Sequence, residues 1–83
     1  MKKIIFIFLL ISALSFGATI QDCRDAVINR GYTILREHRV TPDSGGELAM
    51  NFGASKNGEQ YSIYVEVSSS GRVIVFDVMA YGF

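Results

Sequence analysis

The chain has 83 residues, of which 49% are hydrophobic and 19% charged, and its eight basic residues balance its eight acidic ones. A chain of this length makes one domain with a small core. The charge balance excludes the basic surface that nucleic acids and anionic membranes attract, so neither partner is expected. The single cysteine, Cys23, excludes a disulfide within the chain.

The first residues predict a secretory signal peptide. Two lysines precede a mainly apolar run over residues 4–14, and small residues follow up to Gly17. This order is typical of an export signal, and the run is shorter than the roughly 20 residues of a membrane-spanning helix. We expect residues 1–17 to be removed, with cleavage after Ala18 as the alternative. The mature domain, 18–83, is then exported to the periplasm or the exterior without stable membrane insertion.

A short helix is the first element predicted in the mature domain. It begins after Thr19, because Thr19 and Asp22 have the spacing of a capping box, and it ends at Gly31, which can take a left-handed conformation. Its apolar residues fall on one stripe: Ile20, Cys23, Ala26 and Val27. The stripe places Cys23 in the core as a free thiol. An intermolecular disulfide is the alternative.

Four strands are predicted after the helix. Residues 32–40 read as the first strand, although their alternation breaks at Ile34-Leu35, and a turn-rich loop, "TPDSGG", follows. Residues 47–55 alternate apolar and polar side chains, as a half-buried strand does. Asn57-Gly58 then gives the strongest short-range hairpin signal and leads into the third strand. The turn "SSSG" separates the third strand from the fourth.

The two hairpins predict the same inward face. The first pairs Leu48 with Val67, Met50 with Val65, Phe52 with Ile63, Ala54 with Tyr61 and Lys56 with Glu59. The second pairs Val67 with Arg72, Val65 with Ile74, Ile63 with Phe76 and Tyr61 with Val78. The inward side chains are then Leu48, Met50, Phe52, Tyr61, Ile63, Val65, Ile74, Phe76 and Val78. We therefore expect an α+β fold, with one N-terminal helix packed on a four-stranded antiparallel meander.

No catalytic residue, cofactor or metal ligand is predicted. His38 is expected to be solvated on the first strand, and nothing in the spacing brings it to Cys23 as a nucleophile–base pair requires. The chain has no His-x-His or Cys-x-x-Cys spacing for a metal. We expect a protein that is not an enzyme.

The opposite face of the C-terminal hairpin is the candidate binding surface. It presents Tyr64, Val73, Val75 and Met79, interrupted by Ser62, Glu66 and Asp77. Exposed apolar patches on small proteins mark partner sites, and Tyr and Met are enriched at interfaces, although single valines are also ordinary strand formers. The edge from Val73 to Tyr81 could also pair with a partner strand. The leading prediction is a small exported protein-binding module. The alternative is a structural or envelope protein that forms homo-oligomers through this face or edge.

The segments "GYTILRE" and "GEQYSIYVEVSSSGRVIVFD" resemble the PepSY family of small exported bacterial domains. Gly31, Tyr32, Tyr61 and Gly71 carry the resemblance, which covers residues 20–77. It implies a helix on an antiparallel sheet, as in the β-lactamase inhibitor protein, and a role in inhibiting proteases or regulating exported enzymes. No inhibitory residue can be transferred from it, and a shared fold does not by itself define function.

Overall fold

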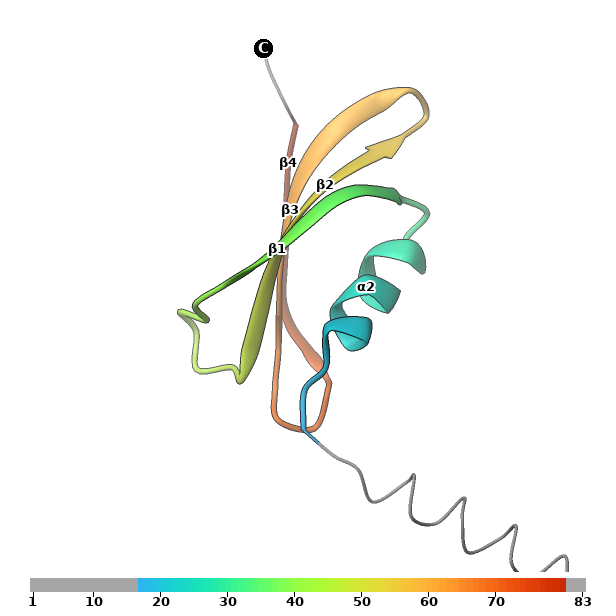
Figure 1. Ribbon diagram of the computed structural model, residues 1–83. Coiled ribbons are helices and arrows are strands. Elements are labelled where there is room, and N and C mark those ends of the chain that lie inside the picture. The colour runs from blue at the N-terminus through green and yellow to red at the C-terminus, as the bar shows by residue number, and fades with distance from the viewer. Residues whose placement is uncertain (1–16, 81–83) are drawn as a thin grey trace, which may run out of the picture.

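The computed structural model describes residues 17–80, which form one helix and four strands. Their order is α2 (Ile20–Ile28), β1 (Thr33–Val40), β2 (Leu48–Lys56), β3 (Glu59–Val67) and β4 (Val73–Ala80). The strands make one antiparallel sheet in the order β1-β2-β3-β4, and α2 lies against one face of it (Figure 1). This arrangement confirms the predicted α+β fold. The predicted signal peptide lies almost wholly outside the described residues.

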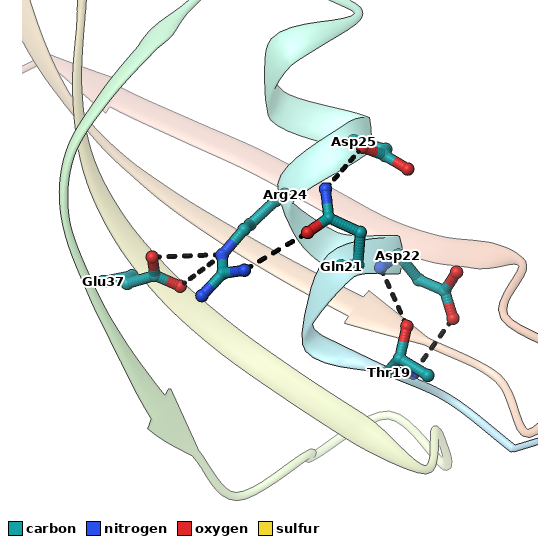
Figure 2. Close-up of polar contacts among 6 residues, drawn as sticks. All are labelled: Thr19, Gln21, Asp22, Arg24, Asp25 and Glu37. Atoms are coloured by element: carbon teal, nitrogen blue, oxygen red, sulfur yellow. Dashed lines mark hydrogen bonds and ion pairs between the residues drawn. The ribbon is translucent and has the colours of Figure 1, made fainter.

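Helix α2 begins where predicted, but it ends at Ile28 and a turn follows up to Gly31. The Asp22 amide donates to Oγ1 of Thr19 at 3.1 Å, and the Thr19 amide donates to Oδ2 of Asp22 at 2.9 Å, which completes a capping box (Figure 2). At the other end, Gly31 has a φ of 91°. The Tyr32 amide donates back to the Val27 carbonyl at 3.3 Å, as follows a left-handed glycine at a helix end.

An ion pair joins α2 to the first strand. Nε of Arg24 lies 3.0 Å from Oε1 and 3.1 Å from Oε2 of Glu37 on β1, and the Arg24 guanidinium also donates to Oε1 of Gln21 (Figure 2). The Arg24 and Glu37 side chains are 39% and 30% exposed, so solvent screens the pair. The pair is therefore expected to add little to the stability of the fold, although it links α2 to β1.

The core lies between α2 and the sheet. The buried residues that pack there are Cys23, Ala26 and Val27 of the helix and Leu48, Met50, Phe52, Ala54, Ile63, Val65 and Val67 of the sheet. Cys23 is a free cysteine with no exposed surface, as its place on the stripe predicted. Burial, and then the charge of Asp22, raises the pKa of its thiol to about 11. Cys23 therefore behaves as a small core residue.

The hairpin of β2 and β3 has the predicted register. Asn57 and Gly58 have φ values of 54° and 82°, as their two-residue turn requires. Lys56 faces Glu59, and the pairing continues as predicted from there to Leu48 and Val67. The break in alternation in the first strand is also real, because the pairing of β1 with β2 shifts between Ile34 and Arg36.

The predicted register of the hairpin of β3 and β4 is wrong by two residues. Phe76 faces Val65 and Val78 faces Ile63, where Ile74 and Phe76 were expected. Two local features cause the shift. First, the Ser68 amide donates to the Arg72 carbonyl, so the turn is one residue shorter than predicted. Second, the pairing passes from Val67 and Val73 to Glu66 and Val75, so Ile74 is an extra residue in a bulge of β4.

The shift changes the environment of three β4 residues. Val73 packs against the core on the inward face, opposite Val67, so its predicted place on the binding surface is wrong. Ile74 was predicted to be in the core but is 44% exposed. Val78 keeps the inward face, opposite Ile63, but is 39% exposed and so is not the core residue that was predicted. Because two one-residue shifts restore the alternation, Phe76 keeps the inward face and packs against the core.

Candidate functional site

The face of the sheet opposite α2, the outer face, is the candidate site. The register places on it Arg36, His38 and Val40 of β1, Ala49, Asn51 and Gly53 of β2, Ser62, Tyr64 and Glu66 of β3, and Val75, Asp77 and Met79 of β4. Figure 1 shows α2 on one side of the sheet and the loop between β1 and β2 on the other. The loop covers one part of the outer face, around Glu66, and leaves the rest of the face open.

Glu66 fastens the loop to the outer face. It has no exposed surface, although a charged side chain is seldom buried without partners. Its partners are the amides of Asp43, at 3.3 Å from Oε1, of Ser44, at 3.1 Å from Oε2, and of Gly46, at 2.6 Å from Oε2, together with the Tyr64 hydroxyl, at 2.6 Å from Oε1. The carboxylate thus accepts hydrogen bonds from three backbone amides of the loop and from a side chain of its own strand.

These contacts shift the pKa values of both side chains. The hydrogen bond from Tyr64 and those from the loop amides lower the pKa of Glu66, against the opposing effect of burial. Burial and the hydrogen bond to Glu66 raise the pKa of Tyr64 to about 12. Near neutral pH, Glu66 is therefore the acceptor and Tyr64 the donor.

A hollow of about 470 Å³ lies on the outer face next to this anchored loop. Its lining residues are Asn51, Ser62, Tyr64, Asp77, Val78 and Met79. Asp77 is the one charged residue among these six. Met79, two positions from Asp77 on the same face of β4, is 65% exposed, so apolar surface lies beside the carboxylate. Tyr64 joins the two features, because its side chain lines the hollow while its hydroxyl binds Glu66.

The structure brings together two of the four residues predicted for binding. Tyr64 and Met79 line the hollow. Val75 lies on the outer face opposite Glu66, half-buried and outside the hollow, while Val73 is on the other face. Sequence reasoning placed Ser62, Glu66 and Asp77 on this face but gave them no role, because nothing local shows that a loop 20 residues away covers Glu66.

The residues considered for catalysis lie apart. Cys23 is on α2 and buried against the inward face of the sheet, whereas His38 is exposed on β1, on the outer face. Within residues 17–80, no group of three or more His, Cys, Asp or Glu side chains could hold a metal ion. In the same range, no helix is long and apolar enough to cross a membrane.

Fold and site together define a small α+β domain with one helix-covered face and one hollowed face. Comparisons with protein-family models, curated proteins and solved structures find no match to the chain. The resemblance to PepSY domains thus stays a prediction from the residues that carry it.

Proposed function

We propose that the chain is a small exported protein-binding module that regulates or inhibits an envelope or secreted enzyme through the hollow on its outer face. The observation that carries this proposal is the hollow itself. It combines the exposed apolar side chain of Met79 with the ring of Tyr64 on a face that the helix does not cover. Tyr and Met are enriched at interface centres, where a rigid or adaptable apolar contact is surrounded by polar groups.

The lining also indicates the chemistry of the partner. Asp77 supplies a carboxylate, while Asn51 and Ser62 can each donate and accept hydrogen bonds. A basic side chain of the partner would place its charge at Asp77 and its aliphatic stem along Met79. The anchored Tyr64 hydroxyl favours binding to a surface that is already formed, since less order is lost when the partner docks.

The test is affinity capture from cells that express the tagged full chain, with Met79→Glu and Ile28→Glu compared. Both residues are exposed apolar side chains, at 65% and 51%, so neither change should unfold the domain. We expect Met79→Glu to lose an exported protein that the unchanged chain and Ile28→Glu both retain. The proposal fails if Met79→Glu captures the same proteins as the control.

Export is tested on the same material. The signal sequence predicts that the purified protein starts at Ala18, or at Thr19 for the alternative cleavage, and that it is found in the periplasm or medium. Cytoplasmic protein that still begins at Met1 would contradict export. The capture experiment would then test protein binding alone.

A further inference from the structure

The two edges of the sheet differ in charge. In the described sheet, β1 and β4 are the outer strands, each of eight residues, and each leaves one side of its backbone without a neighbouring strand. Strand β1 carries Arg36, His38 and Arg39, and its one acid, Glu37, is paired with Arg24 of the helix. Strand β4 carries a single charged residue, Asp77, among apolar ones. One edge is therefore basic, and the other is acidic and apolar.

The rows of the sheet define how these edges would meet. Pairing runs from His38 through Asn51 and Tyr64 to Asp77 in one outer-face row, and from Val40 through Ala49 and Glu66 to Val75 in another. In an antiparallel meander, a second copy in the same orientation presents its β1 antiparallel to β4 of the first. If each row of one copy continues directly into the same row of the next copy, Asp77 on β4 faces His38 on β1 of the second copy.

The neighbouring row supports the same register. Val75 then faces Val40 of the second copy, which pairs two β-branched side chains on the outer face. The irregularities near Leu35 and Ile74 confine regular pairing to residues 36–40 and 75–79. A short contact of this kind predicts association that depends on concentration.

Pairing of like edges is less favourable. Two β4 strands related by a two-fold axis at Asp77 would place two carboxylates opposite each other. A two-fold axis at Val78 avoids that contact, but it leaves Asp77 opposite Met79 with no charged partner. Two β1 strands would bring together residues 36–39, which are mainly basic. The charges thus favour contact between unlike edges.

We propose that β4 of one copy pairs antiparallel with β1 of a second copy, with Asp77 facing His38, so that the sheet continues from chain to chain. Because α2 lies on one face of the sheet (Figure 1), copies related in this way would keep their helices on the same face of the extended sheet. The contact is heterologous, so each added copy leaves one free edge and the assembly does not stop at a dimer. This inference does not depend on the partner proposed for the hollow.

The test is sedimentation velocity over a range of protein concentrations on the protein purified from cells that express the full chain. We expect the mean mass to rise beyond that of a dimer as concentration increases. Asp77→Lys removes the carboxylate and adds a positive charge to an edge that would meet the arginine-bearing strand β1, so it should raise the concentration needed for half-association about tenfold. His38→Asp should do the same, and the double variant Asp77→Lys with His38→Asp should restore association.

Controls separate the edge contact from other effects. Asp77 and His38 are exposed, so circular dichroism should show that each variant folds. Ile28→Glu, on the helix, should leave association unchanged. The proposal is overturned by a monomer at every concentration, by growth that stops at a dimer, or by a double variant that associates no better than the single ones.

Discussion

The hydroxyl of Tyr64 donates a 2.6 Å hydrogen bond to Oε1 of Glu66, two positions further along the same face of β3. Through this bond and the amides of the loop, a buried carboxylate joins the loop between β1 and β2 to the sheet. Among the described residues, no buried side-chain nitrogen or oxygen lacks a hydrogen-bond partner. The loop and the hollow beside it are therefore expected to stay in place together.

Removal of the Tyr64 hydroxyl should destabilise the domain. Tyr64→Phe leaves the ring in the hollow but takes one donor from Glu66, so we expect a loss of about 1 kcal/mol in the free energy of unfolding. Glu66→Gln should lose more, because the amide keeps only one acceptor oxygen and its NH2 group, which can only donate, would face the donors of the loop or of Tyr64. Urea unfolding measures both changes.

The matched control is Tyr61→Phe, whose hydroxyl makes an exposed 3.3 Å bond to Glu59. This change should leave the unfolding free energy within about 0.5 kcal/mol of the original. Equal losses of unfolding free energy in Tyr61→Phe and Tyr64→Phe would show that the hydrogen bond to Glu66 stabilises the domain no more than an exposed one does.

Acid should weaken the anchor. The hydrogen bonds from Tyr64 and the loop lower the pKa of Glu66 from its ordinary value of 4.5, so folding favours the carboxylate. A group whose pKa is lower in the folded state stabilises the fold above its ordinary pKa, and this contribution is lost as the pH falls through the lowered value. The Tm of the unchanged chain should therefore exceed that of Glu66→Gln at neutral pH, and the difference should shrink in acid. A difference that is the same at both pH values would contradict this link.

Gly46 should not tolerate a side chain. A Cβ at this position would lie 2.6 Å from both Cγ and Oε2 of Glu66 and 2.8 Å from the carbonyl oxygen of Val67. Gly46→Ala should therefore move the loop and cost roughly 1–3 kcal/mol, the usual range for an overpacked site. Ser44→Ala keeps the Ser44 amide donor and is the control for the loop. If the two changes have equal effects on urea unfolding, the close approach at Gly46 does not matter.

Local signals in the sequence predicted the helix and the first hairpin. Thr19 and Asp22 form their capping box, and Asn57-Gly58 sets the register through contacts between near neighbours. The role of Glu66 could not be predicted, because an acid in an alternating strand looks solvent-facing until a distant loop covers it. The hollow was found only in part, since Tyr64 and Met79 were predicted to bind, whereas Ser62 and Asp77 were placed on the same face without a role.

The register of β4 was missed for a different reason. "SSSG" is compatible with turns of more than one length, and a bulge has no residue signature of its own in "VIVF". Apolar residues at every position from Val73 to Phe76 gave no alternation to choose between registers. The consequence is a direct contrast between two neighbours, since Val73 is partly buried against the core and Ile74 is exposed at the surface.

This contrast can be measured with threonine, which keeps the branched side chain that strands favour. Val73→Thr places a hydroxyl against the core and should cost about 1–2 kcal/mol in urea unfolding. Ile74→Thr, at a side chain that is 44% exposed, should change stability by about 0.5 kcal/mol or less. The register first predicted from the turn gives the opposite order, with Ile74 in the core opposite Val65. A larger loss at Ile74 than at Val73 would therefore restore that register and return Val73 to the outer face.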